Sequence, residues 1–254
     1  MTTENRARMR AALRGAVGKA LLPAAELTHP GRFTPPPSER YDLEERFRAE
    51  LTKLAGVVHD ARSTDDVASI IMEVAAANAT TSAFVGPSVS PAKATTSAFV
   101  GPGFSPANAP KILMWDEREL PVPGLAEALR ARGATILTQS PDKTRDNAHR
   151  AELATAVVGV TGADGGLAAT GSIVLTSGPG RGRLASLLTP IHVAVLKRSR
   201  LFETLATYIG QHPEAVTAGA NFVCITGPSR TADIEHVLAR GVHGPKEIHV
   251  VMVD

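Results

Sequence analysis

Apolar and polar positions alternate along residues 41–254 with two different periods, which predicts helices and strands in turn. Helical spacing places Leu43, Phe47, Leu51 and Leu54 on one face of a helix over Asp42–Leu54. Further strands are expected at 56–59, 111–115, 134–138, 154–160, 172–177, 191–196, 222–225 and 247–253, and further helices at 64–77, 124–132, 183–188, 199–211 and 231–240. Such alternation predicts an α/β fold, with a Rossmann-like, mainly parallel sheet covered by helices on both faces.

Local signals refine several of these boundaries. Ser63 is expected to cap the helix that begins at Thr64, with Asp66 three residues later forming an acidic capping box. Ser199 is expected to cap the helix that runs to Gln211. Glycine-rich stretches at 162–167 and 178–182 are predicted to be turns.

The chain divides into an extension and one larger domain. Residues 1–40 form an N-terminal extension, with a basic stretch at 1–19 and a proline-rich linker at 30–38, and residues 41–254 form the α/β domain. Within that domain, residues 79–93 recur almost unchanged as 94–108. This period and copy number do not suit a solenoid, so 79–108 is interpreted as a duplicated loop insertion.

Composition removes several classes of function. Apolar residues make up 43% of the chain, enough for a sizeable core, and the formal net charge is only +2. Because the basic stretch at 1–19 has no interleaved aromatic residues, no nucleic-acid partner is expected. The sequence contains neither the roughly 18 consecutive apolar residues of a membrane span nor a signal peptide at its start. A cytoplasmic protein is therefore expected.

A single cysteine constrains the redox chemistry. Cys224 lies within the strand expected at 222–225, where it is predicted to be buried and unreactive. An iron–sulfur cluster normally needs four thiolates, so no cluster or other cofactor is expected in this chain. Any electron transfer must then involve a partner subunit or an organic cofactor.

The most informative stretch is the strand–turn–helix predicted over residues 222–240. Gly227 and Pro228 end the strand, and Ser229 is a candidate N-cap. Free backbone N–H groups and the helix dipole at this point would favour a phosphate or carboxylate, with Arg230 beside it as a bidentate clamp and Thr231 in the first turn. Ligands of parallel sheets also collect beyond the carboxyl ends of strands. The alternative is an ordinary, well-capped turn.

Other candidates carry similar alternatives. Thr170, Gly171 and Ser172 precede a strand and suit either a small anion or a tight turn into that strand. His192 is either a core histidine or a general base, and His243 either fills a turn or faces a pocket. The arginines at 181 and 183 could supplement anion binding, and Asp233 is either a ligand contact or, with Glu235, an acid that favours the helix N-terminus. Spacing typical of a metal site is not found.

Four of these segments together resemble the LUD (lactate utilisation) domain family, in its short, cluster-free LutC/YkgG branch. The segments are Ala169–Ser172, Thr189–Val195, Gly227–Glu235 and Gly241–Pro245, in that order. The resemblance is concentrated in residues 150–254. Family members usually carry an acidic residue where this chain has Ala169.

This resemblance implies a fold of the NagB/RpiA/CoA-transferase group and a role in oxidising L-lactate to pyruvate. The implied partners are iron–sulfur subunits of a lactate-oxidising complex, and the implied ligand is a small carboxylate or phosphate bound at residues 227–231. This chain would then bind a ligand, assist assembly or regulate, without catalysing the reaction alone. The alternative is a stand-alone CoA-transferase-like or sugar-phosphate-isomerase-like enzyme, with Asp233, Glu235 or Asp164 as its catalytic carboxylate.

Overall fold

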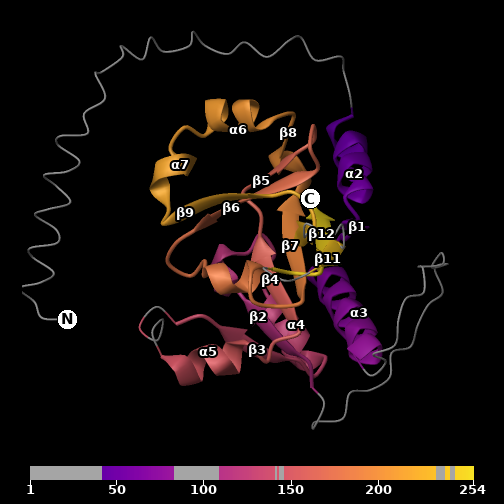
Figure 1. Ribbon diagram of the computed structural model, residues 1–254, viewed down its shortest axis with the longest axis vertical. Helices are drawn as coiled ribbons and strands as arrows, with labels where there is room; N and C mark the ends of the chain where they lie inside the picture. Colours follow the sequence, from indigo (N-terminus) through magenta and orange to yellow (C-terminus); the bar gives the residue numbers. More distant parts are fainter. Residues whose placement is uncertain (1–41, 83–108, 141, 143–145, 233–237, 241–243) are drawn as a thin grey trace, which may run out of the picture. The chain divides into compact units, whose positions relative to one another are not determined.

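A six-stranded, all-parallel sheet forms the centre of the domain in the computed structural model (Figure 1). The structure describes residues 42–82, 109–140, 142, 146–232, 238–240 and 244–254. The extension predicted at 1–40 and most of the insertion predicted at 79–108 lie outside these residues. The strands follow the order β1-β12-β7-β4-β2-β3 and comprise β1 (Val57–Asp60), β2 (Lys111–Met114), β3 (Thr135–Thr138), β4 (Val158–Gly162), β7 (Ile191–Lys197) and β12 (Glu247–Val253).

Both faces of this sheet are covered, as the alternation of strands and helices predicted. In β4 all five residues are buried, and in β12 every residue after Glu247 is buried. Since neighbouring residues of a strand point to opposite faces, burial of consecutive residues requires a layer on each side. The mainly parallel α/β fold expected from the sequence is therefore confirmed.

The helices bear out most of the predicted boundaries. Asp42 caps α2 by accepting from the Glu44 amide at 2.9 Å. At the start of α3, Ser63 Oγ accepts from the Asp66 amide at 3.1 Å, while Asp66 Oδ2 accepts from the Ser63 amide at 3.0 Å, which confirms the capping box. The α-helices are α2 (Leu43–Lys53), α3 (Thr64–Ser82), α4 (Leu125–Ala131), α5 (Asn147–Leu153), α6 (Leu205–Gln211) and α7 (Ala215–Ala218), and the 3₁₀ helices are η2 (Glu117–Glu119), η4 (Arg183–Ser186) and η5 (Arg198–Arg200).

A second, mixed sheet of four strands was not predicted. Its order is β8-β5-β6-β9, with β5 (Gly165–Leu167), β6 (Ser172–Ser177), β8 (Leu201–Phe202) and β9 (Asn221–Ile225). Strand β6 pairs antiparallel with both β5 and β9, while β8 runs parallel to β5. The expected turn at 162–167 is thus partly wrong, because Gly165–Leu167 is a strand. A Cβ on Gly166 would lie 2.7 Å from the Leu196 side chain, so the approach of neighbouring side chains explains this glycine.

The helix predicted from Ser199 to Gln211 is also partly wrong. The chain first forms η5 and β8, and the helix α6 begins only after Thr204, whose hydroxyl accepts from the Thr207 amide at 3.2 Å. Phe202 explains the delay. Phe202 is 6% exposed, and its ring meets Tyr208 edge to face with 5.0 Å between the ring centroids. Burying Phe202 in the apolar cluster that it forms with Leu167 and Val174 favours a strand at this point.

The position of strand β9 differs from the prediction, which changes the expected surroundings of Gly227 and the expected burial of Cys224. It belongs to the four-stranded sheet, so Gly227 does not follow a strand of the parallel sheet. Because β9 is an edge strand, Cys224 is exposed rather than buried. Desolvation nevertheless raises the pKa of its thiol, which disfavours the nucleophilic thiolate.

The helix predicted over 231–240 is wrong in the residues that the structure describes. Strands β10 (Arg230–Ala232) and β11 (Leu238–Arg240) pair antiparallel, with Thr231 opposite Ala239. The intervening residues, including Asp233 and Glu235, lie outside the described part of the chain. A helix of ten residues depends on packing of its apolar face for stability, and here strand pairing overrides the amphipathic pattern.

Candidate functional site

Strand order identifies where a ligand would bind to the parallel sheet. From β2 the chain moves outward to β3 at one edge, whereas from β4 it moves through β7 and β12 toward the other edge. The direction therefore reverses between β2 and β4. In open parallel sheets the crevice beyond the carboxyl ends at such a point is the usual ligand site.

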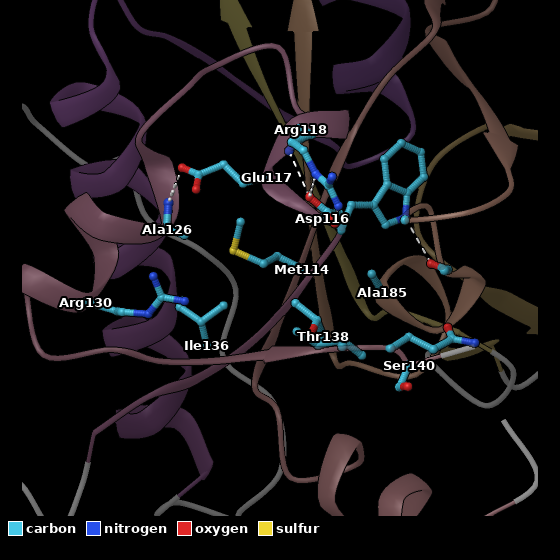
Figure 2. A pocket seen from close by; sticks show the side chains of 15 residues that line it. Met114, Asp116, Glu117, Arg118, Ala126, Arg130, Ile136, Thr138, Ser140 and Ala185 are labelled. Carbon is cyan, nitrogen blue, oxygen red and sulfur yellow. Dashed lines mark hydrogen bonds and ion pairs between the residues drawn. The ribbon is translucent and has the colours of Figure 1, made fainter. Parts of the chain in front are cut away.

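A cavity of about 550 Å³ opens at this point (Figure 2). Trp115 and Asp116 follow β2, while Gln139 and Ser140 follow β3. Figure 2 shows apolar and charged side chains gathered around the same space. The other lining residues are Leu113, Met114, Glu117, Arg118, Ala126, Arg130, Ile136, Thr138, Gly180, Gly182 and Ala185.

The glycine-rich turn at 178–182 forms one wall of this cavity and is firmly held. The Trp115 indole N–H donates to the Gly182 carbonyl at 2.9 Å. The Asp116 amide donates to the Gly180 carbonyl at 2.8 Å. A Cβ on Gly182 would lie 2.4 Å from Gln139 Oε1 and 2.8 Å from Gln139 Cβ, so Gln139 would have to shift to admit a larger residue. The predicted turn is confirmed, and its backbone is fixed against the ends of β2 and β3.

A smaller cavity of about 370 Å³ shares Arg118 with the first. It lies at the carboxyl ends of β4 and β7, marked by Gly162 and Lys197. Four cationic side chains line it, at 118, 181, 197 and 200, against two acidic ones at 119 and 164. The remaining lining residues are Leu120, Pro121 and Ala163. Four positive and two negative side chains give the cavity a formal charge of +2, which favours an anion.

An ion pair between Asp164 and Arg181 organises the wall of the smaller cavity. Arg181 Nη2 lies 2.5 Å from Asp164 Oδ1, and the Thr176 amide donates to Asp164 Oδ2 at 2.7 Å. The Arg181 guanidinium also stacks over the Trp115 ring, 4.6 Å from its centroid. Both Asp164 oxygens are therefore already engaged, Oδ1 by the Arg181 guanidinium and Oδ2 by a backbone amide. This arrangement does not favour Asp164 as the catalytic carboxylate of a stand-alone enzyme.

The predicted segment Thr170–Ser172 meets Thr226, the residue just before the predicted 227–231 turn, through hydroxyl groups. Thr170 Oγ1 lies 2.7 Å from Ser172 Oγ, which lies 2.8 Å from Thr226 Oγ1. Gly171, between them, has a φ of +61°, and a Cβ there would lie 2.3 Å from the Leu51 backbone nitrogen. Gly227 likewise has a φ of +88° and packs against Leu54. Both glycines are explained by contact with the end of α2.

The two resemblance motifs near the C-terminus also touch. The Ser229 amide donates to the Pro245 carbonyl at 2.9 Å, and a Cβ on Gly244 would lie 3.4 Å from Ser229 Cβ. Pro228 is buried in this turn. Arg230 and Thr231 belong to β10, so the helix N-terminus on which their anion-binding role depended is missing from the described residues. Asp233 and His243 lie outside the described part of the chain.

None of these predicted residues lines either carboxyl-edge cavity. The site residues that the sequence did not identify are Trp115, Arg118, Lys197 and Arg200. Arg181, already considered as a supplement, does line the smaller cavity, while Arg183 begins η4 and lines neither. A signal was available, since Trp115 ends one predicted strand and Lys197 directly follows another.

His192 is a core histidine, as one of its two interpretations held. It has no exposed surface, and its Nε2 lies 2.9 Å from Thr161 Oγ1. Burial, with a smaller contribution from the charge of His249, lowers its pKa to about 3. The imidazole is therefore neutral at physiological pH and remote from solvent. Among the described residues, no group of three or more His, Cys, Asp or Glu side chains is arranged to hold a metal ion.

Comparison with known proteins agrees with the resemblance. The model of the LUD domain matches residues 44–253. Lactate utilization protein C from Shouchella clausii (strain KSM-K16) is 35% identical over 152 residues, covering 58% of this chain and 63% of that protein. The protein YkgG from Escherichia coli (strain K12), itself uncharacterised, is 34% identical over 136 residues, covering 52% of this chain and 58% of that protein. The matches thus span less than two thirds of these relatives.

One solved structure supports the fold. The crystal structure of a DUF162 family protein from Deinococcus radiodurans aligns with a TM-score of 0.52, covering 86% of this chain and 100% of that chain. Its sequence is 19% identical, so the likeness concerns the fold alone. No helix in the described ranges is long and apolar enough to cross a membrane.

Proposed function

Because this chain belongs to the LUD domain family, we propose that it is a LutC-like accessory subunit in the oxidation of L-lactate to pyruvate. Iron–sulfur partner subunits would carry the electrons, and this chain would bind a small anionic ligand. The observation that carries the proposal is the family match together with relatives named Lactate utilization protein C.

The sequence explains why partners would be needed. A chain with one cysteine cannot supply the four thiolates that an iron–sulfur cluster normally takes. Cys224 is moreover an exposed residue on an edge strand, which is unlike the arrangement of such a site. The two-electron oxidation of an alcohol to a ketone would therefore pass its electrons to clusters held elsewhere in the complex.

We place the anionic ligand at the carboxyl edge of the parallel sheet rather than at the 227–231 turn. The turn lost its main physical support when residues 230–232 proved to be a strand. The carboxyl edge instead combines a strand-order reversal, two adjoining cavities and an excess of cations. A carboxylate such as that of lactate or pyruvate suits this charge.

Co-purification tests the proposed assembly. A tagged chain expressed in its own cells on lactate is expected to bring down cysteine-rich subunits in fixed ratio, together with iron and acid-labile sulfide. The same tag on an unrelated protein serves as the control. Recovery of the chain as an iron-free monomer under these conditions would argue strongly against a subunit role.

A further inference from the structure

We propose that the smaller carboxyl-edge cavity is an oxyanion site in which Lys197 and Arg200 hold the carboxylate of a small organic acid or a phosphate. This proposal concerns binding by the chain itself. It therefore stands or falls independently of the lactate-oxidising complex.

Arg200 is fixed in place by contacts that leave its charge uncompensated. Its Nε donates to the Asp164 carbonyl at 2.9 Å, and its Nη1 donates to His212 Nε2 at 3.1 Å. The guanidinium also lies over the Phe202 ring, 5.6 Å from its centroid. These partners are a carbonyl, an imidazole and an aromatic ring, so none supplies a full negative charge. Within the described ranges, Arg200 forms no ion pair with a carboxylate.

Lys197 supplies a second cation of the same kind. It is the last residue of β7, its side chain is exposed, and it forms no ion pair within the described part of the chain. A cationic ammonium at a cavity rim and a fixed guanidinium are the two groups that proteins use most for carboxylates and phosphates. Because Arg200 is already oriented, little side-chain entropy would be lost when an anion binds.

The other two cations of the cavity are already matched with acids. Arg118 pairs with Asp116 at 2.7 Å, and this contact lowers the pKa of Asp116 to about 2. Arg181 Nη2 pairs with Asp164 Oδ1, and Arg181 Nε lies 3.6 Å from Glu119 Oε2. At this distance the buried Nε makes an ion pair with Glu119 but no hydrogen bond. An oxyanion oxygen in the cavity would supply the missing hydrogen bond.

Tryptophan fluorescence can report anion binding to this cavity. Trp115 is its single tryptophan, and its ring contacts the Arg181 guanidinium. Titration of the full chain with L-lactate, pyruvate or inorganic phosphate, at constant ionic strength set with chloride, is expected to change tryptophan fluorescence and to release or absorb heat in a saturable way. The carboxylate and phosphate titrations identify which source of the oxyanion the site accepts.

Matched variants locate the binding. Lys197→Gln and Arg200→Gln are each expected to weaken binding about tenfold or more, because each removes one charge-assisted contact. Lys111→Gln removes the same charge at the amino end of β2, away from the carboxyl ends of the strands. Its dissociation constant for the anion is expected to stay within about twofold of that of the parent chain. If Arg200→Gln fails to fold, the exposed Lys197 decides the test alone. Absence of saturable binding to all three oxyanions at millimolar concentration would overturn the proposal, as would equal binding by Lys197→Gln and Lys111→Gln.

Discussion

Substituting Gly171 by alanine is expected to lower the free energy of unfolding by about 2–5 kcal/mol in the absence of any ligand. A left-handed backbone costs roughly 1–2 kcal/mol for a residue with a side chain, and overpacking costs roughly 1–3 kcal/mol more. Gly171 has a φ of +61°, and a Cβ there would meet the Leu51 nitrogen at 2.3 Å and the Glu50 carbonyl carbon at 2.7 Å. Since these contacts are backbone atoms, no side-chain rotation relieves them.

Denaturant unfolding of Gly171→Ala against Gly178→Ala measures this effect. A methyl group on Gly178 would have no neighbouring heavy atom within 4 Å, so this substitution is expected to change stability by less than about 0.5 kcal/mol. Equal stabilities for the two variants would show that Gly171 does not pack against α2 and would return it to the ligand-binding candidates.

Acidification is expected to destabilise the fold steeply between pH 6.5 and pH 3 because of His192. Burial lowers the folded-state pKa of its imidazole to about 3, from an ordinary value of 6.5. Above pH 6.5 the histidine is neutral in both states and has no effect. Between the two values the unfolded chain binds a proton that the folded chain does not, so stability falls as the pH falls. The loss approaches about 1.4 kcal/mol per pH unit, or roughly 2.7 kcal/mol at pH 4.5.

A second histidine steepens the same trend. His59 Nε2 lies 2.9 Å from His249 Nδ1, and burial, followed by the charge of His249, lowers the pKa of His59 to about 4. Its contribution is smaller than that of His192 because its ring is partly exposed to solvent. Urea unfolding from pH 7 to pH 4 is expected to show a shallower pH dependence in His192→Gln, even though that variant is less stable at pH 7. An unchanged slope would contradict the role given to His192.

Sequence patterns predicted the parallel sheet well because its signals are local. Strand β12 reads as a run of apolar residues, and burial on both faces requires such a run. The start of α3 was equally legible, since the reciprocal bonds of Ser63 and Asp66 connect residues three apart. In both cases, the interactions that determine the structure lie within the segment itself.

The remaining elements depend on partners that are distant in the sequence. Strand β5 is Gly-Gly-Leu, which has little strand propensity, and it exists because β6 and β8 pair with it. The segment at 231–240 has an amphipathic pattern typical of a helix, yet its described ends pair as β10 and β11. Competition between these outcomes is decided by tertiary contacts, which the pattern does not contain.

The candidate site also combines contacts that the sequence predicted with contacts that depend on strand order. Thr170–Ser172 and the turn after β9 were expected to act together, and the hydroxyls of Ser172 and Thr226 do meet at 2.8 Å. Their role as a ligand site stays a prediction, while packing on the end of α2 accounts for the positive φ values at Gly171 and Gly227. Lys197 and Arg200 come together with Gly162 only because β4 and β7 are neighbours in the sheet, which requires knowledge of strand order.

Lactate-dependent dye reduction by the reconstituted complex tests the central claim most directly. The assay compares the complex with this chain, without it, and with the Lys197→Gln variant, using Lys111→Gln as the matched control. We expect activity to be lost when the chain is omitted, to be lowered by Lys197→Gln, and to be unchanged by Lys111→Gln. Loss only on omission, with Lys197→Gln fully active, would keep the subunit role and remove the ligand site from it. Full lactate oxidation in the absence of the chain would contradict the proposed function.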